Sequence, residues 1–248
     1  MKIFNSKLLA PYNNLIHAFT TRLDGVSTYG NNLAYHVNDN SKQVDQNHNR
    51  LATYLQYPLK HLVHMNQIHG DKIISINRNH DFKETPTCDA LITQEKQTPL
   101  MVMVADCIPI LLYDPIQKVI AVVHAGRAGV FTNILSKTIK KMKNEYECET
   151  KDIIVALGPS IHQCCYEVGS EVKHEAEEIG LEYAIKTDND HYYLDLISIV
   201  QQELSELRIK KNNIETSEYC TTCNTDTFYS YRAEKNSCGR FAGVIMLK

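Results

Sequence analysis

Long apolar runs along the chain predict buried β-strands. Residues 99–114 (PLMVMVADCIPILLYD) and 119–126 (VIAVVHAG) are rich in Val, Ile and Leu without strict alternation, which is typical of strands covered on both faces. The DPIQ segment between them contains Asp-Pro, a turn signal, so we expect the two runs to form an antiparallel pair. Residues 152–161 (DIIVALGPSI) predict another buried strand that ends at Gly-Pro.

A different periodicity predicts helices. After residue 126 the apolar positions recur every three or four residues, which indicates one helix with a buried face: Phe131, Ile134, Leu135, Ile139 and Met142. Residues 171–180 and 195–209 carry similar patterns, and the second places four aliphatic residues on one side: Leu196, Val200, Leu204 and Leu207. Residues 213–220 and 239–248 predict closing strands. Together these elements predict an α/β or α+β layered sandwich with mixed sheets and outer helices.

Composition narrows the class of protein. The length of 248 residues, without a repeat or a long linker, favours one domain over residues 1–248. Lys plus Arg total 26 against 29 Asp plus Glu, a net charge of −3 that argues against a nucleic-acid partner. No stretch approaches the roughly 18 apolar residues of a membrane span, and the N-terminus lacks an apolar segment of signal length. We therefore expect a cytoplasmic protein with reduced cysteines and no membrane partner.

Three residues suggest a metal or nucleophile site. Cys107 and His124 lie on the two runs expected to pair, and His69 lies in the NQIHGD segment. An imidazole can activate a thiolate for attack on a carbonyl, whereas two imidazoles and one thiolate form the three-ligand set of an open catalytic zinc site. Each residue by itself is more often a packed core residue, but their position beside turns favours a site. A role for His69 favours zinc.

Four arginines are candidates to hold an anion. Arg22, Arg127, Arg232 and Arg240 could each bind a phosphate or carboxylate through paired N–H donors. Most arginines are solvated surface residues, so each is weak evidence alone. Asp106 could orient a histidine or act as an acid or base, but strand alternation points it away from the face of Cys107, and its role stays open.

The remaining cysteines suggest a second metal site only weakly. Cys220 and Cys223 form a C-x-x-C, which Cys164 and Cys165, or Cys238, could complete as a structural zinc site. A second C-x-x-C is absent. Because adjacent residues on a regular strand face opposite sides, we expect at most one of Cys164 and Cys165 to be functional.

A series of short motifs is distributed along nearly the whole chain. In order they are HAFTTRLDGVS, NQIHGD, CDALIT, ADCIPILLYDP, VIAVVHAG, GPSIHQCCYEVG, LDL, CTTC, FYSYR and GR. The series resembles the YfiH/YlmD-type proteins, long labelled laccase-domain or polyphenol oxidase proteins and described as purine nucleoside phosphorylases with adenosine deaminase activity. The resemblance implies a four-layer α/β/β/α sandwich related to the catalytic domain of cytotoxic necrotizing factor toxins. It also implies a zinc site whose His, Cys and His ligands fall on His69, Cys107 and His124.

The chain departs from the family pattern at one point. The family usually continues its second histidine motif as His-Ala-Gly-Trp-Arg-Gly, whereas this chain has Arg127 and Ala128 where Trp and Arg are expected. Adjacent side chains in a turn point in different directions. A guanidinium at position 127 could serve in place of the usual one, and the sequence leaves open what it contacts.

The resemblance implies a zinc enzyme that acts on purine nucleosides and phosphate. The expected reactions are phosphorolysis of adenosine, inosine and methylthioadenosine to the free base and a ribose 1-phosphate, and hydrolytic deamination of adenosine. Arg22, Arg232 or Arg240 would share the charge of the phosphate. The sequence leaves open which nucleoside is preferred and whether the chain forms a homodimer.

Three other interpretations stay open. Cys107 as nucleophile and His124 as base would make a thiol amidohydrolase acting on a peptidoglycan precursor or a protein amide, an interpretation that gives His69 no task. A binding or assembly protein would hold the metal without turnover. Copper polyphenol oxidation is the least supported, because no His-x-His pair supplies the further copper sites that such an enzyme needs.

Overall fold

The computed structural model describes residues 1–81, 83–235 and 237–248, and within them the chain forms three β-sheets. The largest, here the central sheet, is mixed: β12 runs parallel to β8 and β3 parallel to β4, and the other neighbours are antiparallel. Its strands, in spatial order, are β12 (Ile214–Thr216), β8 (Ile154–Leu157), β6 (Ile108–Asp114), β7 (Val119–Ala125), β4 (Ala90–Thr93) and β3 (Ile73–Ser75).

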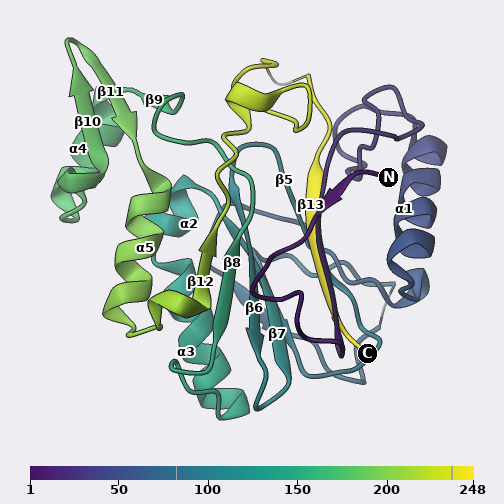
Figure 1. Cartoon of the computed structure of the whole chain (residues 1–248). Helices are drawn as coiled ribbons and strands as arrows, with labels where there is room; N and C mark the ends of the chain where they lie inside the picture. The colour runs from purple at the N-terminus through teal and green to yellow at the C-terminus, as the bar shows by residue number, and fades with distance from the viewer. Residues whose placement is uncertain (82, 236) are drawn as a thin grey trace.

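The second sheet is antiparallel and lies against one face of the central sheet (Figure 1). Its strands, in spatial order, are β1 (Ile3–Phe4), β2 (Leu15–Thr20), β13 (Phe241–Leu247) and β5 (Leu100–Val104). Side chains from both sheets share one apolar cluster, in which Leu111 and Val122 pack with Phe241 and Ile245. All four are fully buried. This shared interior holds the two sheets face to face.

Helices cover the outer faces of these two sheets. Ile139 of α3 (Ile134–Tyr146) and Val200 of α5 (Leu196–Glu206) belong to the cluster on the outer face of the central sheet. On the far side, α1 (Ser41–Leu55) lies beside the second sheet (Figure 1), and its Leu51 belongs to the apolar cluster that includes residues of that sheet. Asn40 caps α1 by accepting a hydrogen bond from the N–H of Gln43, which satisfies one of its free amide donors.

A small third sheet was not expected from the sequence. Its antiparallel strands are β10 (Ile185–Asp188), β11 (His191–Leu194) and β9 (Glu167–Val168), and it lies with α4 (Ser170–Glu178) at one corner of the molecule (Figure 1). The mixed α/β class is thus confirmed. No helix in the described part of the chain has the length and apolar character needed to cross a bilayer. The relationship to the toxin domain stays a prediction.

The predicted hairpin is confirmed, but its first run is two strands rather than one. β6 and β7 pair from Asp114 opposite Val119 to Ile108 opposite Ala125, and their alternate residues face the helices and the second sheet. Residues 99–114 instead divide into β5, in the second sheet, and β6, in the central sheet. Asp106, with φ of 89°, makes the sharp turn between them. Apolar content cannot reveal this change of sheet, because both strands are buried on both faces.

The helix expected after residue 126 is also interrupted. The chain forms α2 (Arg127–Phe131) and then α3, with Asn133 between them in the left-handed region at φ of 59°. Asn tolerates that conformation better than most residues. The short α2 keeps the backbone of residues 126–129 at the end of β7, where the candidate site lies.

Candidate metal centre

The structure brings His69, Cys107 and His124 together from three separate segments. Each residue offers one possible ligand atom, a ring nitrogen of either histidine or the sulfur of Cys107. These three atoms lie within 4.8 Å of one another. His124 is on β7, and His69 lies in the loop before β3. Cys107 was expected on a strand and is instead in the turn between β5 and β6, one residue before β6 begins. The turn lets its sulfur project from the end of the hairpin toward both imidazoles.

Asp89 orients both histidines and was missed by the sequence analysis. Its carboxylate lies 2.8 Å from Nδ1 of the buried His124. The same carboxylate accepts backbone N–H bonds from Ile68, His69 and Gly70 at 3.3, 3.0 and 2.8 Å. Because Nδ1 of His124 is engaged, its Nε2 is left to face the sulfur. The available signal was an acidic residue in the CDALIT motif, at the head of a buried apolar run.

Local backbone geometry explains why the NQIHGD and HAG segments have their sequences. The side chain of Gln67 donates to the carbonyl of Met103 at 2.8 Å and accepts the N–H of the same residue at 3.0 Å, which anchors the His69 loop to β5. His69 has a left-handed backbone, with φ of 57°. A Cβ at Gly126 would lie 3.0 Å from Sγ of Cys107, so any larger residue there would crowd the sulfur.

The electrostatics of His69, Cys107 and His124, here called the trio, favour a thiolate at Cys107. Burial opposes the charged form of Cys107, but the adjacent His124 and His69 outweigh it and lower the pKa of the thiol to about 6. Burial also opposes the charged form of His124, yet Cys107 and Asp89 raise the pKa of its imidazole. In the absence of a metal, the result is a thiolate and imidazolium pair backed by a carboxylate.

The donor set fits a zinc ion with an open position. Two imidazoles and one thiolate are a known catalytic ligand combination for zinc. The Asp89 contact to the far nitrogen of His124 is the outer contact that metal-bound histidines usually make. The rings of His69 and His124 are nearly perpendicular, at 80°, with centroids 4.7 Å apart. The three donors therefore converge from different directions and do not stack.

The trio lies in the wall of a cavity of about 840 Å³, a size typical of small-molecule sites. Arg232 and Arg240, two of the three arginines expected to bind substrate, also line it. The guanidinium of Arg232 lies over the ring of Tyr166, with 5.3 Å between the guanidinium carbon and the ring centroid, and that of Arg240 lies over Tyr231 at 5.7 Å. The cavity thus combines donor atoms, positive charge and aromatic faces.

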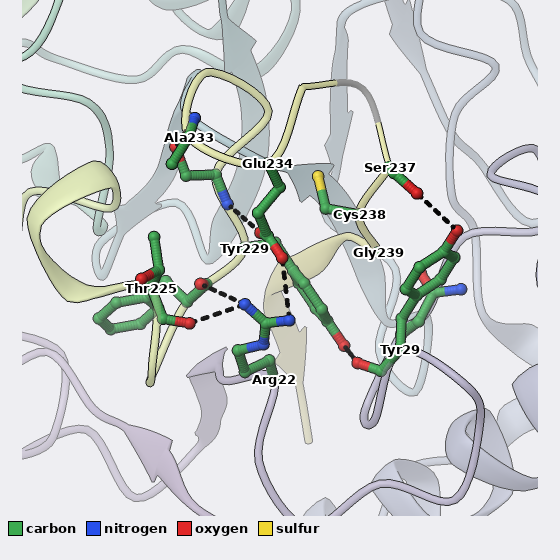
Figure 2. Close-up of polar contacts among 12 residues, drawn as sticks. Arg22, Tyr29, Thr225, Tyr229, Ala233, Glu234, Ser237, Cys238 and Gly239 are labelled. Atoms are coloured by element: carbon green, nitrogen blue, oxygen red, sulfur yellow. Dashed lines mark hydrogen bonds and ion pairs between the residues drawn. The ribbon is translucent and has the colours of Figure 1, made fainter.

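The third of these arginines, Arg22, lies elsewhere. It is absent from the described residues that line the cavity. Figure 2 shows its guanidinium bound to the carbonyl of Thr225, at 2.7 Å, and paired with Glu234, at 3.0 Å. It also lies over the ring of Tyr229, with 4.8 Å to the centroid. These contacts use its donors to join the segment after β2 to the loop before β13, so Arg22 is not carried forward as a substrate ligand.

Arg127 and Ala128, where the motif resemblance predicted Trp and Arg, both line the cavity. Arg127 forms an ion pair with Glu175 of α4 and lies over the ring of Phe131. Its charge is therefore already partnered by a carboxylate. The guanidinium of Arg127 is therefore not equivalent to that of an unpaired arginine at position 128.

The four cysteines at 164, 165, 220 and 223 form a second cluster, with sulfur atoms all within 4.8 Å of one another. The expectation that at most one of Cys164 and Cys165 is functional assumed a regular strand, whereas both residues lie in a turn, so this geometric ground for it is removed. Cys238 is not part of the cluster; its sulfur lies 3.5 Å from the guanidinium of Arg240.

Comparison with known proteins identifies the family. A family model described as multi-copper polyphenol oxidoreductase laccase matches residues 16–248. The chain belongs to this family. Within it, a purine nucleoside phosphorylase of Clostridium acetobutylicum is 34% identical over 223 residues, covering 90% of each chain. A purine nucleoside phosphorylase of Corynebacterium glutamicum is 34% identical over 244 residues, covering 96% of this chain and 97% of its own.

Solved structures of the family have the same fold. The hypothetical protein YfiH of Bacillus licheniformis superposes with a TM-score of 0.90 at 27% identity, covering 95% of this chain and 94% of its own. YlmD of Geobacillus stearothermophilus gives a TM-score of 0.88 at 27% identity, with 96% and 93% covered. The resemblance read from the motifs is thereby confirmed.

Proposed function

We propose that the protein is a purine nucleoside phosphorylase whose active site is the cavity around His69, Cys107 and His124. The observation that carries the proposal is that these three donors share one cavity wall with Arg232 and Arg240. Two relatives that are 34% identical over nearly the whole chain are named purine nucleoside phosphorylases. The cavity volume of about 840 Å³ accommodates a nucleoside together with phosphate.

In phosphorolysis an oxygen of phosphate forms a bond to C1′ of the ribose while the bond from C1′ to the purine nitrogen breaks. The electron pair of the broken bond leaves with the base, which takes up a proton. Arg232 and Arg240 supply fixed positive charge for the phosphate, and the rings of Tyr166 and Tyr231, over which these guanidiniums lie, help to hold them in the cavity wall. Holding both reactants in one cavity lowers the entropic part of the barrier.

A Zn²⁺ held by His69, Cys107 and His124 would supply a Lewis acid beside the reacting atoms. Asp89 keeps His124 in the tautomer that presents Nε2, and the low pKa of Cys107 provides the thiolate a metal requires. We extend the proposal to adenosine deamination, in which an oxygen from water replaces the amino group at C6 and ammonia leaves. The same three metal donors and the same cavity support this second reaction.

The proposal is tested with Cys107→Ala and His124→Ala, with the exposed His174→Ala as the matched control. We expect both site variants to lose the zinc ion held at His69, Cys107 and His124 together with nucleoside turnover, and the control to retain both. Chromatography of adenosine and inosine, incubated with and without phosphate, separates phosphorolysis from deamination, and elemental analysis measures zinc. Full phosphorolysis by a variant that no longer binds zinc at His69, Cys107 and His124 would contradict the proposal.

The arginines have a separate test. We expect Arg232→Met and Arg240→Met to raise the KM for phosphate by tenfold or more, since each removes a charged hydrogen bond worth about 1.5–3 kcal/mol. Arg208→Met, at an exposed position, is the control. A KM for phosphate unchanged in both variants would place the phosphate elsewhere.

A thiol hydrolase is the second candidate, because Cys107, His124 and Asp89 also form a thiol, imidazole and carboxylate series. Here His69→Ala should retain activity, and iodoacetamide should label Cys107 in metal-free protein with loss of amidase turnover. Copper oxidation of phenols, which the family description names, would need more histidine-rich sites than the two donor clusters found among the described residues. Metal analysis of protein purified without added copper tests it.

A further inference from the structure

Four cysteines outside the cavity wall come together from two distant loops. Cys164 and Cys165 lie in the loop between β8 and β9, and Cys220 and Cys223 lie in the loop between β12 and β13. Cys164 and Cys223 are exposed, and only Cys220 is buried. Free cysteines usually gather because they pack as small apolar side chains in a core. Core packing does not explain a cluster that is half exposed.

The distances between the sulfur atoms match those around a single tetrahedral ion. Sγ of Cys164 lies 3.6 Å from Sγ of Cys165 and 3.8 Å from that of Cys223, and Cys165 and Cys223 are 3.3 Å apart. A zinc ion with Zn–S bonds of about 2.3 Å places its four sulfurs about 3.8 Å apart. A disulfide would require about 2.05 Å. The arrangement is therefore that of four separate thiols around one point.

The backbone of both loops directs the sulfurs inward. The N–H groups of Cys165 and Tyr166 both donate to the carbonyl of His162 at 3.0 Å, forming the turn that lets two adjacent cysteines face one side. The N–H of His162 donates to Sγ of Cys220 at 3.4 Å. Such donors to sulfur are the outer contacts that stabilise metal thiolates. Asn224 closes the C-x-x-C turn by donating to the carbonyl of Cys220 at 2.8 Å.

We propose that Cys164, Cys165, Cys220 and Cys223 bind a structural zinc ion, separate from the metal at His69, Cys107 and His124. Four thiolates saturate a tetrahedral ion and leave no open position, which is the pattern of structural zinc. Binding releases the thiol protons to solvent and stabilises the folded state, because the unfolded chain does not hold the four sulfurs together.

The zinc ion would clamp the two loops that support one side of the cavity. Thr221, between the two cysteines of the C-x-x-C, donates its hydroxyl to Asp106 at 2.6 Å, and the N–H of Arg232 donates to the same carboxylate at 2.7 Å. Asp106 immediately precedes Cys107. The guanidinium of Arg232 also reaches the carbonyl of Cys165 at 3.4 Å. The clamp thus holds Arg232 in position relative to the Cys107 turn.

Metal counting tests the proposal independently of the proposed function. Protein purified under reducing conditions should hold two zinc ions per chain, and Cys223→Ser and Cys165→Ser should each hold one and still bind zinc at the trio. His69→Ala should also hold one, now at the four cysteines. Cys148→Ala, which removes a thiol outside both clusters, is the matched control and should hold two.

The outcomes separate the two sites. Zinc that is lost in His69→Ala but unchanged in both cysteine variants would overturn this proposal and leave the proposed function standing. A thiol titration of denatured protein that finds two thiols fewer than eight, with no metal at the cluster, would overturn it in favour of a disulfide. A coloured iron thiolate would also overturn it. As a positive signature, Co²⁺ in place of zinc in His69→Ala should show the strong visible absorption of an ion with four thiolate ligands. In Cys223→Ser the absorption should fall to that of an ion with one thiolate, Cys107.

Discussion

Asp89→Asn isolates the contribution of one buried carboxylate to the site. The Asp89 side chain is fully buried and accepts bonds from His124 and from the N–H groups of Ile68, His69 and Gly70. One oxygen serves His124 and His69, and the other serves Ile68 and Gly70. Asn replaces one oxygen with an NH₂ group, so two donors lose their acceptor whichever way the amide turns.

The structure gives the size of the effect. Two lost bonds to a charged acceptor, at about 1.5–3 kcal/mol each, predict a loss of about 3–6 kcal/mol in the free energy of unfolding. For a chain of this size, 3 kcal/mol corresponds to a fall in Tm of about 6–12 °C. Zinc affinity at the trio should fall about 10- to 100-fold, because His124 loses the partner that fixes its tautomer.

The assay is urea unfolding of metal-free protein, followed by a zinc titration of the folded variant. Asp71→Asn is the matched control, because Asp71 is 42% exposed and pairs with the exposed Lys137. It should change stability by less than about 1 kcal/mol. An Asp89→Asn protein within 1 kcal/mol of the wild type and with unchanged zinc affinity would refute the role given to this carboxylate.

Three further predictions concern the surroundings of the site. A Cβ at Gly129 would lie 2.9 Å from the carbonyl oxygen of Gly70, so Gly129→Ala should displace the loop that carries His69 and lower the free energy of unfolding by about 1–3 kcal/mol. The same zinc titration should show weaker binding at the trio, and an unchanged zinc affinity would contradict this prediction. Burial lowers the pKa of His48 to about 4, below its value near 6.5 in the unfolded chain. Between these pH values only the unfolded state binds the proton, so the free energy of unfolding should fall by up to about 3 kcal/mol as the pH drops from 6.5 to 4. His48→Gln should flatten this pH dependence in unfolding measured across the same range, and an equal slope in both proteins would contradict the prediction. Arg22→Met removes a half-buried pair with Glu234 and should lower Tm while leaving the KM for phosphate unchanged; a raised KM would return Arg22 to the substrate site.

The sequence predicted the elements with strong local patterns. The run at 119–126 became β7, residues 152–161 contain β8, and the periodic segment at 195–209 contains α5. Such elements follow from nearest-neighbour spacing along the chain, because a buried face needs apolar residues at regular intervals. The third sheet escaped prediction, since its short strands are largely exposed and lack that pattern.

The site was predicted by residue chemistry more than by position. His69, Cys107 and His124 were selected as ligand types, and the motif series placed them in a family. Asp89 was missed because an acidic residue becomes informative only once the N–H groups it binds are known, and three of these belong to a loop about 20 residues away. Arg22 was chosen for its charge, which the folded chain uses for an internal pair with Glu234.

What the sequence by itself determined is the inventory: buried strands, amphipathic helices and a set of thiol, imidazole and guanidinium groups. Only the tertiary structure decided which groups meet. The turn at Asp106 moves the chain from one sheet to the other and directs Cys107 toward the histidines, and a turn beside His162 lets Cys164 and Cys165 face one point. The hydrogen bonds of the His162 turn are local, but the contacts from Asp106 to Thr221 and Arg232, and from His162 to Cys220, join residues far apart in the chain. Local spacing does not encode these contacts.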